Sequence, residues 1–211
     1  MTKVKICGLK TLDDVEAVNL YKPDYIGFVF ANTRRFLTDE EAFTLKQALS
    51  KDIQAVGVFV DEPIDHILSL CDRNIIDMVQ LHGEETEAYI RELKQKTDKP
   101  VIKAVKVQNK EQVKQEISKE ADYMLFDTYK KGVLGGTGER FPLEILEQCL
   151  QEWKQENNTV KPYFLAGGLT PENVSEVLSQ VSCYCVDVSS GVETGGKKDK
   201  HKIKAFINRV K

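Results

Sequence analysis

The sequence lacks the long apolar runs and the leader that would place it in or across a membrane. Its longest apolar run, 25–31, is far shorter than the roughly 20 residues that a helix needs to span a bilayer. Met1, Thr2 and Lys3 lead directly into a strand-like run, without the apolar stretch of a secretory signal peptide. We therefore expect a cytoplasmic protein that has no membrane partner.

An excess of charge of one sign is also missing. Thirty Lys and Arg residues stand against 33 Asp and Glu residues, which gives a net charge of -3, and the two signs are interspersed along the chain. This pattern does not predict a basic surface for nucleic acid. The 5 cysteines are irregularly spaced, so a disulfide framework is not expected, and Cys183 with Cys185 lacks the spacing and the second pair of a zinc site. We expect reduced thiols and no metal.

What the sequence does contain is a short apolar run followed by an amphipathic stretch, repeated along the chain. The apolar runs predict strands at Val4–Cys7, Tyr25–Phe30, Ala55–Val60, Met78–Leu81, Val101–Val105, Tyr123–Asp127, Tyr163–Ala166 and Tyr184–Val188. Their nearly continuous Val, Ile, Leu and Phe content is typical of parallel strands that are covered on both faces.

Helix starts are marked by capping residues between these runs. Thr38 with Glu41 and Asn109 with Gln112 have capping-box spacing, and the pair Thr170-Pro171 predicts a hydroxyl cap followed by proline in the first helical position. Eight strand–helix units in 211 residues predict an α/β fold, a single compact (β/α)₈ (TIM) barrel over residues 1–211. A doubly wound sheet of eight strands is the alternative.

In a barrel of this kind the loops that follow the strands build the active site. Cys7, Asp127 and Asp187 lie at or near the ends of predicted strands, and His82 directly follows another. Glycines after the seventh and eighth strands occupy the loops that most often hold a phosphate in this fold, although each glycine alone could serve only a tight turn. The candidate phosphate residues are Gly167, Gly168, Ser189, Ser190 and Gly191, and Gly135 and Gly136 lie in a long loop typical of a lid or binding loop.

Seven segments, taken in order, resemble the signature segments of the phosphoribosylanthranilate isomerase family. They are Lys5–Leu9, Gly27–Phe30, Val56–Val60, Val79–Gly83, Gly135–Gly138, Gly167–Leu169 and Val186–Glu193, which together span nearly the entire chain. The resemblance implies a barrel enzyme of tryptophan biosynthesis that works without a cofactor. Its implied reaction is the Amadori rearrangement of N-(5-phosphoribosyl)anthranilate to 1-(2-carboxyphenylamino)-1-deoxyribulose 5-phosphate.

The resemblance also implies roles for individual residues. Asp127 would be the general acid and Cys7 the general base, and a thiol with a pKa of about 8.5 needs only modest stabilisation of its thiolate for that task. Arg35 would bind the anthranilate carboxylate in a bidentate manner. His82 and Asp187 would contact the substrate together with the glycine and serine residues of the three loops. The implied partners are a small phosphoribosyl substrate and other enzymes of the tryptophan pathway.

Other interpretations remain open for most of these residues. Cys7 could be a packing residue, since cysteine is among the most buried residue types, and the strand-end aspartates could cap turns. Lys5 or Lys103 could form a Schiff base in an aldolase of the same fold. A non-catalytic barrel that binds sugar phosphates would need only the phosphate loops. The basic run 197–202 predicts a solvated helix start.

Overall fold

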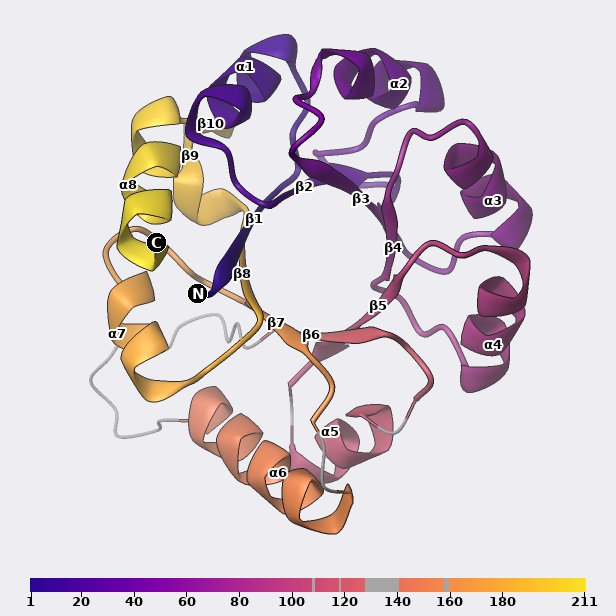
Figure 1. Ribbon diagram of the computed structural model, residues 1–211, viewed down its shortest axis with the longest axis vertical. Helices are drawn as coiled ribbons and strands as arrows, with labels where there is room; N and C mark the ends of the chain where they lie inside the picture. The colour runs from indigo at the N-terminus through magenta and orange to yellow at the C-terminus, as the bar shows by residue number, and fades with distance from the viewer. Residues whose placement is uncertain (108, 118, 128–140, 158–159) are drawn as a thin grey trace.

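Eight parallel strands close into a barrel in the computed structural model, which describes residues 1–107, 109–117, 119–127, 141–157 and 160–211. Figure 1 shows the ring of strands with the helices outside it. Each strand pairs with the next along the chain, and β8 pairs with β1 to close the ring. The strands are β1 (Lys3–Cys7), β2 (Tyr25–Val29), β3 (Gln54–Phe59), β4 (Met78–Leu81), β5 (Val101–Lys106), β6 (Tyr123–Asp127), β7 (Tyr163–Ala166) and β8 (Cys185–Val188). The predicted barrel is confirmed, and the doubly wound alternative is wrong.

Helices follow the strands and cover the outside of the ring. They are α1 (Leu12–Tyr21), α2 (Asp39–Ala48), α3 (Ile64–Asp72), α4 (Glu87–Lys96), α5 (Lys110–Ile117), α6 (Phe141–Asn157), α7 (Val174–Gln180) and α8 (Lys200–Val210). Between β8 and α8 lie a short 3₁₀ helix, η1 (Ser190–Val192), and a small hairpin of β9 (Glu193–Thr194) and β10 (Lys197–Lys198). None of the helices within the described ranges is long and apolar enough to cross a membrane.

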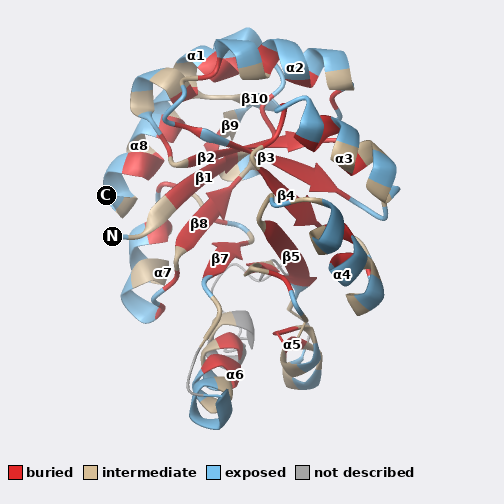
Figure 2. Ribbon diagram, turned by 45° about the vertical axis from the view of Figure 1, so that its right-hand side comes forward, coloured by how far each residue is buried: buried red, intermediate tan, exposed pale blue. Residues whose placement is uncertain are grey.

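The alternation of side chains along each strand creates two apolar regions. Side chains such as Ile6 and Phe28 belong to the large core between the ring and the helices, whereas Met78, Leu125 and Phe164 belong to a second cluster that fills the ring itself. Figure 2 shows the buried strands inside a shell of helices whose outer faces are exposed. Every strand therefore has an inward row of side chains that leads to the same end of the barrel.

Two of the three predicted helix starts are present. Thr38 accepts a hydrogen bond from the Glu41 N–H, and the Glu41 carboxylate accepts one from the Thr38 N–H, which is a complete capping box for α2. Asn109 Oδ1 accepts from the Gln112 N–H at the start of α5. These local signals fix where the loops end and the helices begin.

The third predicted helix start is wrong, because α7 begins at Val174 and not at Pro171. Thr170 Oγ1 does accept a hydrogen bond from the Glu172 N–H, but Asn173 Oδ1 accepts from the Thr170 N–H and folds 170–173 into a turn. The chain after β7 therefore remains a loop for longer than the proline suggested.

Candidate active site

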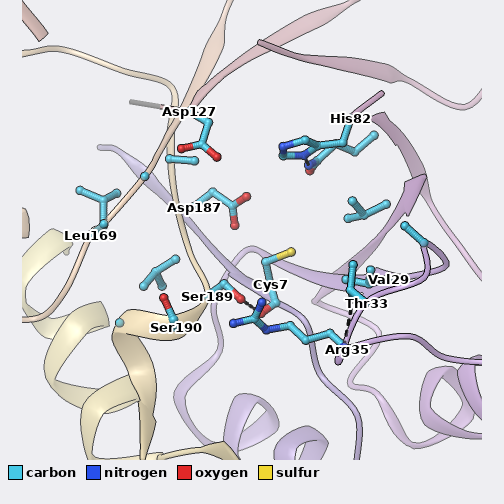
Figure 3. A pocket seen from close by; sticks show the side chains of 18 of the residues that line it. Cys7, Val29, Thr33, Arg35, His82, Asp127, Leu169, Asp187, Ser189 and Ser190 are labelled. Atoms are coloured by element: carbon cyan, nitrogen blue, oxygen red, sulfur yellow. Dashed lines mark hydrogen bonds between the residues drawn. The ribbon is translucent and has the colours of Figure 1, made fainter. Parts of the chain in front are cut away.

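A cavity of about 450 Å³ opens where the barrel strands end, and Figure 3 shows the side chains that line it. It brings together all the predicted site residues that the structure describes, from β1, β6 and β8 and the loops after β2, β4, β7 and β8. These residues are Cys7, Arg35, His82, Asp127, Gly167, Gly168, Asp187, Ser189, Ser190 and Gly191. The predicted loop residues Gly135 and Gly136 lie outside the described residues.

The Cys7 thiol lies in the wall of this cavity because its neighbour on β2 has no side chain. Cys7 pairs with Gly27 across the β1–β2 ladder, and a Cβ on Gly27 would lie 2.6 Å from Cys7 Sγ. The thiol packs beside Val29 and Val58. All the cysteines are free thiols, but Cys7 is half-buried whereas the other four are buried. Cys7 is therefore the one cysteine placed to meet a bound molecule.

Two lysines act on the Cys7 thiol electrostatically. Burial raises the pKa of Cys7, and the positive charges of Lys5 and Lys198 oppose that rise without cancelling it. Both lysine side chains are themselves buried, at 0% and 2% exposed. Formation of the Cys7 thiolate is thus favoured by the charges of Lys5 and Lys198, which the sequence did not predict to lie near Cys7.

Lys5 and Asp187 form an ion pair inside the barrel. They lie opposite each other on β1 and β8, and Lys5 Nζ lies 2.8 Å from Asp187 Oδ2. Burial alone would lower the pKa of Lys5, but the Asp187 carboxylate and Cys7 raise it above its ordinary value, so the amine stays protonated. Among the described residues, Asp187 Oδ1 is the buried side-chain oxygen that has no hydrogen-bond partner. Buried acceptors are rarely left unsatisfied, so Oδ1 is suited to accept from a ligand N–H or O–H group.

His82 enters the cavity from the end of β4. Its Nδ1 lies 2.9 Å from Nε2 of Gln80, an inward residue of β4 two positions earlier in the chain. Burial lowers the pKa of His82, and the nearby Asp127 carboxylate opposes this effect only in part. Figure 3 shows the His82 ring and the Asp127 carboxylate directed into the same part of the cavity.

Arg35 is held at the cavity by Glu193. The Arg35 Nε group donates to Glu193 Oε1 at 3.0 Å, and Glu193 also accepts from Arg34 and Lys198. Burial would raise the pKa of Glu193, but hydrogen bonds from these three cations lower it to about 2. A guanidinium fixed through Nε can still present its terminal nitrogens to a carboxylate.

The loops after β7 and β8 pack directly against each other. Gly191 allows this contact, because a Cβ there would overlap the Leu169 carbonyl oxygen. Ser189 Oγ donates to the Cys7 carbonyl oxygen at 2.9 Å, which ties the β8 loop to the end of β1. The two loops thus form one wall of the cavity, in the position that holds phosphate in many barrels of this type.

Sequence reasoning misplaced Lys198 and missed Gln80 and Glu193 as parts of this site. Lys198 was expected in a solvated helix start, but the β9–β10 hairpin turns it inward, where Nζ donates to Glu193 Oε1 at 2.9 Å and to the Ser189 carbonyl oxygen at 3.0 Å. Gln80 could have been found, since a residue two positions before His82 in a strand shares its face.

Neither lysine of the aldolase alternative is suited to form a Schiff base, which requires a neutral amine in contact with the substrate. Lys5 is protonated and bound to Asp187 and Gln80. Lys103 alternates with inward residues of β5, so it lies on the helix side of the strand, where Nζ donates to Glu85 Oε2 at 2.7 Å. Within the described ranges, no group of three or more His, Cys, Asp or Glu side chains is placed to hold a metal ion.

A closed (β/α)₈ barrel with a carboxyl group, a thiol and a wall from the loops after β7 and β8 at one end has the layout of barrel enzymes that act on phosphorylated substrates. A family model described as N-(5'phosphoribosyl)anthranilate (PRA) isomerase matches residues 4–209. The chain belongs to this family.

Individual relatives agree with that assignment. The N-(5'-phosphoribosyl)anthranilate isomerase of Lachnoclostridium phytofermentans is 48% identical over 210 residues, which cover 97% of this chain and 95% of the relative. The crystal structure of phosphoribosyl anthranilate isomerase from Thermotoga maritima is 35% identical, with a TM-score of 0.84 over 99% of this chain and 98% of that one. A second solved structure of such an isomerase, in complex with reduced 1-(o-carboxyphenylamino)-1-deoxyribulose 5-phosphate, has a TM-score of 0.83 and 33% identity over the same shares.

Proposed function

We propose that this cavity carries out the family reaction with Asp127 as the general acid and Cys7 as the general base. The chain is an isomerase of tryptophan biosynthesis, which converts N-(5'-phosphoribosyl)anthranilate by an Amadori rearrangement. The observation that carries the proposal is the placement of the Asp127 carboxyl group and the Cys7 thiol in the lining of one cavity, although β6 and β1 are far apart in the sequence.

The first step opens the ribose ring. Asp127 donates its proton to the ring oxygen as the bond between C1′ and that oxygen breaks, and the nitrogen lone pair forms an iminium with C1′. The Cys7 thiolate then removes the proton from C2′, and those electrons neutralise the iminium and leave an enolamine. A proton added at C1′ and one lost from the C2′ hydroxyl give the ketone product. Each positioned acid or base typically contributes roughly 10² to 10⁴ in rate.

The remaining residues bind the two charged ends of the substrate. Arg35, oriented by Glu193, would bind the anthranilate carboxylate. The phosphate would lie against the backbone N–H groups of the wall formed by Gly167, Gly168, Ser189, Ser190 and Gly191. Asp187 Oδ1 would accept a hydrogen bond from the substrate, and His82 would contact it on the Asp127 side. Gly135 and Gly136 stay a prediction for the phosphate end.

The wider setting of the enzyme is also a proposal. Residues 1–211 would act as one catalytic domain, in the cytoplasm, on a small phosphoribosyl substrate. Contacts with other enzymes of the tryptophan pathway would come from outside the cavity, because its lining is occupied by the residues that bind substrate.

The test replaces the acid and the base separately. Cys7→Ser and Asp127→Asn keep the size of each side chain, so we expect turnover of freshly prepared N-(5'-phosphoribosyl)anthranilate, followed by its fluorescence, to fall by at least about 10². Binding of the reduced product analogue, measured by calorimetry, should change little. Cys183→Ser, at a buried thiol outside the cavity, is the matched control and should leave turnover intact.

The result also separates the isomerase from the non-catalytic binding barrel. A binding module would hold the analogue and show the same slow background conversion in all three variants. Unchanged turnover in both Cys7→Ser and Asp127→Asn would contradict the assigned roles.

A further inference from the structure

A chain of hydrogen bonds leads from the ion pair inside the barrel to His82. Asp187 accepts from Lys5, whose Nζ also donates to Gln80 Oε1 at 2.9 Å, and Gln80 Nε2 lies 2.9 Å from His82 Nδ1. Lys5 and Gln80 are almost completely buried, at 0% and 1% exposed. Buried groups of this kind must satisfy one another, so the direction of each hydrogen bond follows from chemistry.

The direction is set at Lys5, because an ammonium group can only donate. The Gln80 atom that faces Lys5 must therefore be the carbonyl oxygen, and a flipped amide would point N–H groups at a buried cation. The other end of the amide, Nε2, is then the donor that faces His82. An amide nitrogen has no acceptor capacity, so His82 Nδ1 must carry a lone pair and accept.

The consequence is a single allowed form of the imidazole ring. With Nδ1 as an acceptor the ring is neutral, and its proton is on Nε2. An imidazolium would set an N–H group against the Gln80 N–H group at 2.9 Å. The ring that carries this Nε2–H group enters the cavity on the side of Asp127.

We propose that Gln80 is a positioning residue that holds His82 as the neutral Nε2–H tautomer, which makes His82 a hydrogen-bond donor to a substrate oxygen. This inference rests on the proposed function only in that the cavity is the substrate site. In this form Nδ1 is occupied by the Gln80 N–H group, and the neutral Nε2–H group donates a hydrogen bond but is too weak an acid to transfer its proton, so His82 replaces neither Cys7 as the base nor Asp127 as the acid.

The charges around His82 are compatible with this state. Burial is the largest influence and lowers the pKa of His82; the Asp127 and Asp187 carboxylates favour protonation, whereas Lys5 and Lys106 disfavour it. The balance leaves the pKa of the ring below its ordinary value. Electrostatics and hydrogen-bond direction thus select the same neutral ring by independent routes.

The direct test is the protonation state of the ring nitrogens in the unsubstituted protein. Long-range ¹H–¹⁵N correlation spectra of protein labelled at its 3 histidines distinguish a protonated from an unprotonated ring nitrogen, and loss of one signal set in His82→Gln assigns His82. We expect protonated Nε2 and unprotonated Nδ1 at neutral pH, with the ring titrating below the ordinary pKa of about 6.5. A proton on Nδ1, or titration of the ring at or above the ordinary pKa of about 6.5, would overturn the proposal.

Gln80→Glu tests the cause, because it changes the amide donor into an acceptor of almost the same shape. The introduced carboxylate can still accept from Lys5, but it also accepts from His82 Nδ1–H, so we expect the ring to take up a proton there and its pKa to rise. Gln54→Glu, at the exposed start of β3, is the matched control and should leave the His82 signals unchanged. An unchanged ring in Gln80→Glu would contradict the role of Gln80.

Kinetics then test the donor. His82→Gln retains an N–H donor at the position of Nε2, whereas His82→Leu removes it, so we expect KM to rise about tenfold in the leucine variant and clearly less in the glutamine variant. Equal KM values in the two variants would overturn the donor role. These results are independent of the Cys7 and Asp127 assignments, since the tautomer is read from spectra without turnover, and Cys7→Ser can lose turnover whatever the state of His82.

Discussion

Gly27 and Cys7 are partners across the β1–β2 ladder, and the space that a side chain on Gly27 would take is occupied by the Cys7 sulfur, 2.6 Å from the position of such a Cβ. The location of the proposed base is thus set by the absence of a neighbouring side chain. The pairing of β1 with β2 brings the two residues together, and the missing side chain at Gly27 leaves the space into which the Cys7 side chain points.

Gly27→Ala should therefore impair catalysis more than it impairs folding. The added methyl group must displace the thiol, and a displacement near 1 Å can cost about 10² in rate, so we expect kcat to fall by about that factor. Steady-state kinetics and urea unfolding measure the two effects. Gly57→Ala is the control, because its Cβ would crowd Phe59 and Ile76 in the outer core and should reduce stability with a much smaller effect on kcat. Equal kcat losses in both variants would contradict the prediction.

Lys198→Met should move the pH dependence of the reaction. Cys7, the proposed base, must be deprotonated to act, so we expect kcat/KM to rise as pH passes upward through the pKa of Cys7, which burial has raised. Removing the Lys198 charge removes one of the two cations that oppose this rise, and the ascending limb should shift to higher pH. Lys197→Met, at the exposed neighbour in β10, should leave the limb in place. A limb that does not move would show that Lys198 does not act on the thiol.

Glu193→Gln should make the free energy of unfolding fall less steeply as the pH is lowered. Because its pKa is lowered from 4.5 to about 2 in the folded state, Glu193 contributes stability that is fully present above pH 4.5 and is lost as pH falls toward 2. The contribution is on the order of 3 kcal/mol at neutral pH. Urea unfolding between pH 7 and pH 2.5 should show a shallower decline for the variant. Parallel declines would contradict the assignment.

The buried pair of Lys103 and Glu85 should be costly to break from one side. Lys103→Met leaves the Glu85 carboxylate buried without its cation and should reduce the free energy of unfolding by about 3 to 5 kcal/mol. Adding Glu85→Gln removes the uncompensated charge while its side-chain oxygen can still accept from the N–H groups of Asp61 and Gly83, so the double variant should recover part of the loss. Denaturant titrations of both variants measure the difference. A double variant less stable than Lys103→Met would argue against this account.

The sequence predicted the ring of strands because each strand is a short apolar run with its own helix start, and it predicted the cavity residues Cys7 and Asp127 because parallel strands bring their ends together. It could not predict Lys198, whose direction depends on a hairpin of two short strands. It misjudged Thr170, where a competing side chain, Asn173, stabilises a turn. The role of Gln80 could not be predicted, because it depends on which atom of its amide faces the Lys5 ammonium group. That arrangement is set jointly by the three strands that carry Lys5, Gln80 and Asp187.

The ion pair between Lys5 and Asp187 joins residues separated by 182 positions and lies on the seam where β8 meets β1. A nascent chain that has emerged only through β6 already contains Cys7 and Asp127, yet Lys5 has no carboxylate opposite it and cannot leave water without a large desolvation cost. The proposed acid and base are therefore made early and brought together late. Synthesis of the eighth strand supplies the carboxylate that Lys5 needs, so the ring can close around both groups only after Asp187 has been made.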